Sequence, residues 1–163
     1  MALLKIYTGA APVLRRKARA IRRIDGTIRK LAADMLETMY EAPGVGLAAP
    51  QVGISERLIV VGYEEREYVL INPVLARQSA ETALGEEGCL SLPSLYGDVE
   101  RAVSVRVQGL NLAGKRCTID AEDWLARIFQ HEIDHLDGIL FTDRMAPDAP
   151  LRHVSSGEAE EEI

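Results

Sequence analysis

The sequence predicts an α+β fold, with short antiparallel strands packed around a buried C-terminal helix and another helix near the N-terminus. Three features carry this prediction. Apolar side chains recur at helical spacing in residues 27–41. In residues 121–136 they form two adjacent stripes, which is typical of a deeply buried helix. Between these segments, residues 101–110 alternate apolar and polar side chains with the period of a half-buried strand.

Length and charge indicate one globular domain. The 163 residues fit a single domain, which we expect at residues 1–148. Residues 149–163 end in a run of acids with little to bury, and we expect them to form a disordered tail. A net charge of −6 argues against a nucleic-acid-binding protein. No apolar run approaches the ~20 residues of a membrane span.

The N-terminus is basic, with seven Lys or Arg and no acid in residues 1–24. This composition occurs in organelle transit peptides and in solvated basic arms, and we expect an arm.

A helix follows at about Thr27–Glu41, with Asp25 or Thr27 capping its start and Pro43-Gly44 ending it. The next segment, GVGLAAPQVG at 44–53, resembles neither a good helix nor a good strand. Its glycines allow another group to approach the backbone closely.

The middle of the chain is expected to form a hairpin, a loop and a second hairpin. The segments are a strand at 57–62 (RLIVVG), a turn at 63–66, a strand at 67–73 (EYVLINP), a loop at 85–98 (GEEGCLSLPSLYGD), a strand at 101–110, a turn at 111–115 and a strand at 116–121 (RCTIDA). Cys117 lies in the last of these strands and is interpreted as structural.

The last helix is expected at about Ala121–Leu136, with Asp120 as its N-cap and Gly138 just after its end. No further helix is expected beyond it. Within it, the stretch QHEIDHLDG at 130–138 contains the H-E-x-x-H pattern.

This pattern, His131, Glu132 and His135, predicts a metal-dependent hydrolase site. The two histidines are one helical turn apart and project to the same side. Glu132 lies about 100° round the helix from His131, close enough to reach a water on a metal ion. A buried, ionised Glu132 is costly unless a nearby charge compensates it, and a metal ion supplies that charge.

Two histidines leave one ligand missing, since catalytic sites of this kind normally take three from the protein. The longer pattern H-E-x-x-H-x-x-G-x-x-H has Gly138 in place, but Phe141 stands at its ligand position. The acids further downstream have no predicted helix to hold them. Cys89 in EEGCLSLP is a better candidate than Cys117 in its alternating strand. A Cys, His, His set would leave a fourth position for water.

Three motifs stand in order along the chain: GVGLAAPQ at 44–51, EGCLS at 87–91 and QHEIDHLDG at 130–138. Together they resemble the peptide deformylase family. The similarity covers most of Pro12–Met145, including part of the basic arm, which argues against a transit peptide. The resemblance implies removal of the formyl group from the N-terminal formylmethionine of newly made polypeptides, with release of formate.

The resemblance also implies roles for single residues. It assigns one divalent metal ion to Cys89, His131 and His135. Glu132 would act as general base and then as general acid. The Gln51 side-chain amide and the Leu90 backbone N–H would stabilise the oxyanion.

The resemblance further implies that the substrate lies extended along exposed backbone. The residues implied to bind it are Gly44, Val45, Gly46, Gly88 and Ile128. Val45, Ile128 and His131 would form the methionine pocket, with Trp124 nearby. Burying a Met side chain contributes ~1.5–3 kcal/mol. Glu87 and Arg101 are expected to form an ion pair, either at the pocket rim or in solvent.

The resemblance favours Fe²⁺ in the cell, with Zn²⁺, Ni²⁺ or Co²⁺ in purified protein. Site affinity alone would favour zinc over iron.

Expected partners are N-formylmethionyl nascent peptides, with the ribosome as a candidate, and neither nucleic acid nor a membrane. We expect a cytoplasmic monomer. Three alternatives stay open: an H-E-x-x-H metallopeptidase, a non-catalytic metal-binding module, and a deformylase-like protein with another substrate.

Overall fold

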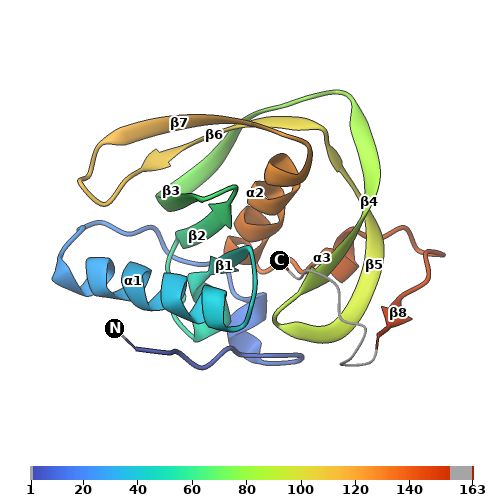
Figure 1. Ribbon diagram of the computed structural model, residues 1–163, viewed down its shortest axis with the longest axis horizontal. Coiled ribbons are helices and arrows are strands. Elements are labelled where there is room, and N and C mark those ends of the chain that lie inside the picture. Colours follow the sequence, from blue (N-terminus) through green and yellow to red (C-terminus); the bar gives the residue numbers. More distant parts are fainter. Residues whose placement is uncertain (1, 155–162) are drawn as a thin grey trace.

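The computed structural model describes residues 2–154 and residue 163, and the predicted α+β class with antiparallel sheets is confirmed (Figure 1). The helices in this part of the chain are η1 (Pro12–Arg15), α1 (Gly26–Glu41), η2 (Ala49–Val52), α2 (Asp123–Leu136) and α3 (Phe141–Arg144), where η denotes a 3₁₀-helix. None of the helices in the described residues is long and apolar enough to cross a membrane.

The strands form two antiparallel sheets. The five-stranded sheet has the spatial order β1-β2-β3-β6-β7, and the three-stranded sheet has the order β4-β5-β8. Their bounds are β1 Gly46–Ala48, β2 Leu58–Tyr63, β3 Arg66–Gln78, β4 Thr82–Cys89, β5 Leu92–Ala102, β6 Ser104–Leu110, β7 Arg116–Glu122 and β8 Arg152–His153. In Figure 1, α2 lies between the larger sheet and the long β4–β5 hairpin.

Helix α1 covers the larger sheet near β1 and β2. The Asp25 carboxylate caps it by accepting hydrogen bonds from the backbone N–H groups of Thr27 and Ile28. Met35 and Met39 are fully buried in the apolar cluster beneath the helix. The helix therefore closes one side of the molecule and leaves α2 enclosed between the sheets.

Helix α2 is the centre of the fold, because all eleven residues from Ala126 to Leu136 are buried. Its end is tightly held. The Leu136 carbonyl accepts hydrogen bonds from the Ala18 N–H at 2.8 Å and from Arg57 at 3.0 Å. Gly138 has φ +75°, and a Cβ there would lie 2.6 Å from the Arg15 carbonyl oxygen. Only glycine therefore fits where the chain leaves this helix.

The expected start of α2 is wrong. Strand β7 continues to Glu122, so the helix begins at Asp123 and Glu122 is the N-cap residue, without a side-chain cap. Asp120 lies within the strand, where its carboxylate pairs with the cross-strand neighbour Arg106 at 2.7 Å. A cross-strand ion pair and a helix cap both suit an aspartate, and the local sequence does not distinguish them.

The loop expected at 85–98 is also wrong, since these residues form much of the β4–β5 hairpin. The hairpin register shifts between Gly88 and Cys89, so that Gly88 pairs with Tyr96 whereas Cys89 pairs with Leu92. Such bulges re-aim side chains and are common beside active sites. Here the bulge occurs directly before Cys89.

Three smaller differences concern irregular segments. The segment 44–53 contains β1 and η2. Strand β1 is three residues long and buried on both faces, so its sequence shows no alternation of apolar and polar side chains. The strand expected at 101–110 breaks at Val103, where the chain passes from β5 to β6. Beyond α2, the short helix α3 is present, and the Asp143 carboxylate caps it through the Leu140 N–H at 3.0 Å.

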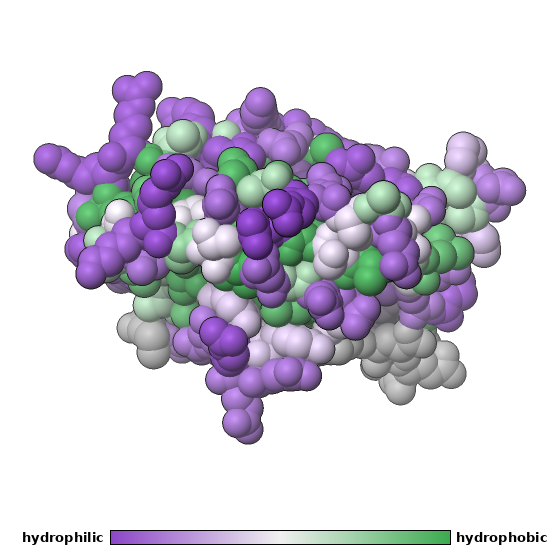
Figure 2. Space-filling view, turned by 90° about the horizontal axis from the view of Figure 1, so that it is seen from above, coloured by the Kyte–Doolittle hydropathy of each residue, from purple (hydrophilic) through white to green (hydrophobic). Residues whose placement is uncertain are grey.

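The C-terminal segment begins in an ordered way. Residues 152–153 form β8 against Leu95 and Tyr96, and Val154 is buried. The rest of the expected tail, except residue 163, lies outside the described residues. In Figure 2, hydrophilic side chains project over most of the face seen from above, with hydrophobic residues visible between them.

Candidate metal centre and active site

Three predicted ligands come together at the centre of the fold. Cys89 ends β4, whereas His131 and His135 lie one turn apart on α2. One donor atom from each lies within 4.8 Å of the others, and all three residues are buried. The Cys89 Sγ is 3.3 Å from His135 Nε2. Phe141, the residue that excluded a downstream histidine ligand, stacks on the His131 ring with the ring centroids 6.2 Å apart.

The chemistry of these donors fits a divalent metal ion. His131 Nδ1 contacts the Glu87 carboxylate at 2.9 Å, while its Nε2 is buried with no hydrogen-bond partner among the described residues. A histidine ligand commonly has this arrangement, with one nitrogen oriented by a carboxylate and the other on the metal. Burial, together with the nearby His131, lowers the pKa of His135 and favours the neutral imidazole that binds metals.

Glu132 is fully buried, and neither of its carboxylate oxygens has a hydrogen-bond partner in the described part of the chain. Burial, with the negative charge of Glu87 as a second cause, raises the pKa of Glu132 well above its ordinary value. Gly46 makes room for this side chain, because a Cβ there would lie 2.5 Å from a Glu132 oxygen. A raised pKa in an unpaired carboxyl group suits a group that exchanges protons.

The Gln51 side chain is buried beside Cys89 and is held there by its own hydrogen bonds. Its Oε1 accepts from the Ala48 N–H at 2.9 Å. Its Nε2 donates to the Ser91 hydroxyl at 3.1 Å and contacts the Cys89 Sγ at 3.6 Å. The amide donor is thus fixed beside the proposed ligand without a group that titrates. Leu90 follows Cys89 directly and is buried.

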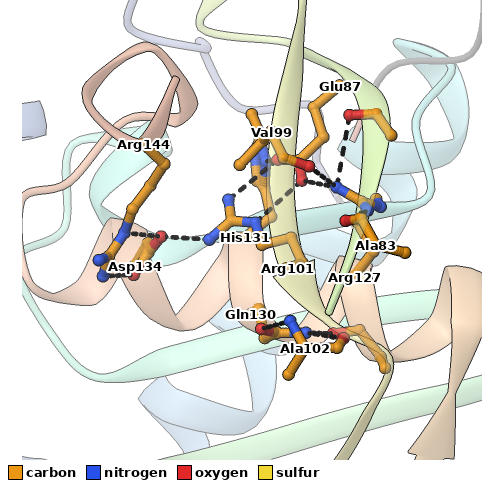
Figure 3. Close-up of polar contacts among 12 residues, drawn as sticks. Ala83, Glu87, Val99, Arg101, Ala102, Arg127, Gln130, His131, Asp134 and Arg144 are labelled. Atoms are coloured by element: carbon orange, nitrogen blue, oxygen red, sulfur yellow. Dashed lines mark hydrogen bonds and ion pairs between the residues drawn. The ribbon is translucent and has the colours of Figure 1, made fainter. Parts of the chain in front are cut away.

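A buried network of charged residues holds the Glu87 carboxylate that contacts His131 Nδ1 (Figure 3). Glu87 receives two hydrogen bonds from Arg101, both at 2.9 Å, and one from Arg127 at 2.8 Å. Arg101 also contacts Asp134 at 2.6 Å. Burial opposes ionisation of Glu87, but the hydrogen bonds from Arg101 and His131 outweigh it and lower its pKa. The Glu87–Arg101 pair therefore exists, and the alternative of a solvated pair is wrong.

The residues expected to bind substrate lie around the same region. Val45 is half-buried and packs on the apolar cluster that contains Ile128. Gly46 is in β1, and Gly44 lies just before it, with its N–H donating to the Met39 carbonyl at 2.7 Å. At Gly88, a Cβ would lie 2.5 Å from the Tyr96 ring. The lack of a side chain at Gly46 and Gly88 thus has a reason within the protein itself.

The family model for polypeptide deformylase matches residues 3–150. The chain belongs to the peptide deformylase family. It is therefore a hydrolase that removes the N-formyl group of nascent peptides, and the metallopeptidase and non-catalytic alternatives are set aside.

Individual deformylases agree with this assignment. The chain is 55% identical to the peptide deformylase of Symbiobacterium thermophilum, over 99% of this chain and 75% of that protein. The crystal structure of the Thermotoga maritima peptide deformylase matches with a TM-score of 0.87 at 41% identity, over 89% of this chain and 99% of that one. The Synechococcus elongatus peptide deformylase, solved in complex with actinonin, matches with a TM-score of 0.86 at 44% identity, over 89% and 80%.

Sequence reasoning missed several parts of this deformylase site. Arg127 and Asp134 carry no local signal, because they lie outside the two apolar stripes of the helix, where a charged residue normally faces solvent. The contact between Gly46 and Glu132 joins residues 86 positions apart, so no local sequence pattern predicts it. The pairing of Glu87 with Arg101, by contrast, was expected from the family resemblance.

Proposed function

We propose that this deformylase binds one divalent metal ion through Cys89, His131 and His135. The observation that supports it most is the cluster of these three buried donors beside the unpaired carboxyl group of Glu132. When bound, such an ion would activate a water molecule and polarise the formyl carbonyl. With only three protein ligands, the site has room for that chemistry.

Glu132 moves the proton in this proposal. Its carboxylate takes a proton from the attacking water and returns it to the nitrogen of the leaving amine. Burial raises the pKa of Glu132, so it holds the proton more readily than an exposed glutamate would. Neither oxygen accepts a hydrogen bond from the part of the chain that the structure describes, so both are available to water and to the amine.

Gln51 and Leu90 would stabilise the oxyanion. The Gln51 Nε2 contacts the Cys89 Sγ at 3.6 Å, and Leu90 follows Cys89 directly in the sequence. Fixed donors of this kind cost no reorganisation when negative charge develops. The Gln51 donor is preorganised by the bond from the Ala48 N–H to its carbonyl oxygen.

The substrate would lie extended beside β1 and the end of β4. We propose Gly44, Val45, Gly46 and Gly88 as its backbone partners. Val45 and Ile128 would contact the methionine side chain, since both belong to the same apolar cluster or pack on it. Trp124 also packs on this cluster, and we expect it to lie near the pocket.

Several expectations from the sequence and from the family resemblance remain predictions. Fe²⁺ is the expected metal in the cell, with Zn²⁺, Ni²⁺ or Co²⁺ possible after purification. A cytoplasmic location, a monomeric state, ribosome contact and a domain limit at residue 148 are expected as well.

The metal assignment is tested by Cys89→Ala, which should empty the site. Metal content per chain is measured after dialysis, for the wild type, for this variant and for Cys117→Ala as the matched control. We expect about one ion in the wild type and in the control, and a large loss in Cys89→Ala together with loss of formate release from formyl-Met-Ala-Ser. Full metal content in Cys89→Ala would refute the ligand set.

The oxyanion role is tested by Gln51→Ala, which should lower kcat by about 10²- to 10³-fold. Because Gln51 also accepts the Ala48 N–H, Gln51→Glu is the second variant: it keeps that acceptor and removes the amide donor. We expect a similar loss in both, and no loss in Gln108→Ala on the exposed face of β6. Wild-type activity in Gln51→Glu would show that Gln51 acts only in folding.

A further inference from the structure

Residue Ile163 lies inside the protein although it is far along the acidic segment. Its side chain is fully buried in the apolar cluster that contains Ile128 and Phe129 and on which Val45 packs. Figure 1 shows this end of the chain at the centre of the molecule, beside α2. Ile163 is thus buried with two of the residues proposed above to contact the substrate's methionine, Val45 and Ile128.

The backbone of Ile163 pairs with the end of β4. Its N–H donates to the Gly88 carbonyl at 3.3 Å, and its carbonyl oxygen accepts from the Leu90 N–H at 3.4 Å. These two bonds flank Cys89, so Ile163 lies alongside Cys89 like one residue of an added parallel strand. Both backbone groups are ones that the proposed function assigns to the substrate or the oxyanion.

We propose that Ile163 is an intramolecular ligand of the substrate-binding site, which a formylated peptide must displace before it can react. The inference rests on the proposed function of Gly88, Leu90 and Ile128. An aliphatic side chain in the apolar cluster and an extended backbone along β4 are the two features that the site would recognise in a peptide. Ile163 offers both.

The attachment of Ile163 to the protein makes this competition effective. Eight residues separate it from Val154, whose N–H donates to the Ser94 carbonyl at 2.8 Å and so fixes the near end. A tether of this length gives an effective concentration in the millimolar range. At this effective concentration, contacts as few as one buried side chain and two backbone bonds compete with a free peptide.

The test compares Ile163→Asp and Ile163→Gly in the full chain with wild type. Asp places a charge in an apolar cluster, and Gly removes the side chain without adding charge. We expect the KM for formyl-Met-Ala-Ser to fall by about tenfold in Ile163→Asp, which corresponds to roughly nine-tenths occupancy by Ile163 in the wild type. Ile163→Gly should give a smaller fall, and kcat should not change. Leu151→Asp, an exposed position in the same segment, should keep the wild-type KM.

Hydrogen exchange of the Leu90 amide provides a readout that does not depend on activity. It should be faster in Ile163→Asp than in the wild type and unchanged in Leu151→Asp. Unchanged KM in both Ile163 variants, whether or not exchange accelerates, would overturn the inference while leaving the enzyme active. Failure of the proposed function would instead appear as absent formate release in the metal-replete wild type.

Discussion

Glu132→Gln should lower kcat for formate release by about 10²- to 10⁴-fold while leaving the metal content unchanged. The substitution keeps the size and shape of the side chain but removes its ability to take and return a proton. Glu132 makes no ion pair or hydrogen bond with the described residues, so no structural contact is lost with its charge. The measurement is steady-state formate release from formyl-Met-Ala-Ser, with metal analysis of the same samples.

Glu122→Gln is the matched control for this experiment. Glu122 is exposed at the N-cap of α2 and makes no side-chain cap, so the same substitution there should leave kcat at the wild-type value. If Glu132→Gln retained wild-type turnover, the proton-transfer role would be wrong. If it lost the metal, the residue would instead support the ligands.

The helix that carries His131 and His135 was predictable because its signal is local. Helical periodicity places both imidazoles on one side, and the apolar stripes around them indicate burial. Cys89 needed a different kind of reasoning, since Phe141 excludes the downstream ligand and leaves an upstream cysteine. The structure brings the three together through a hairpin and a bulge that no local pattern predicted.

The β4–β5 hairpin was missed for a physical reason. Strand propensity is low in GEEGCLS, and two adjacent glutamates are normally exposed. Glu87 is nevertheless almost fully buried, because Arg101 and Arg127 compensate its charge. Those partners are 14 and 40 residues away. Long-range compensation of this kind changes the secondary structure of a segment in a way that its own composition does not reveal.

Arg101→Met should lower the free energy of unfolding by about 3–5 kcal/mol, the usual result of removing one partner from a buried ion pair. Arg101 contacts both Glu87 and Asp134, and its side chain is 5% exposed. Without it, the two buried carboxylates keep Arg127 and Arg144 as their arginine partners among the described residues. Unfolding by denaturant is measured at saturating metal concentration.

The control is Arg106→Met, which removes the same group from the exposed pair with Asp120. Solvent already screens that pair, so stability should change little. The two variants also differ in what they do to the metal. Loss of Arg101 loosens Glu87, which orients His131 through Nδ1, and we expect metal affinity to fall by about 10- to 100-fold. Equal stability in the two variants would show that burial adds nothing to the network. Unchanged metal affinity in Arg101→Met would show that Arg127 alone holds Glu87 in place.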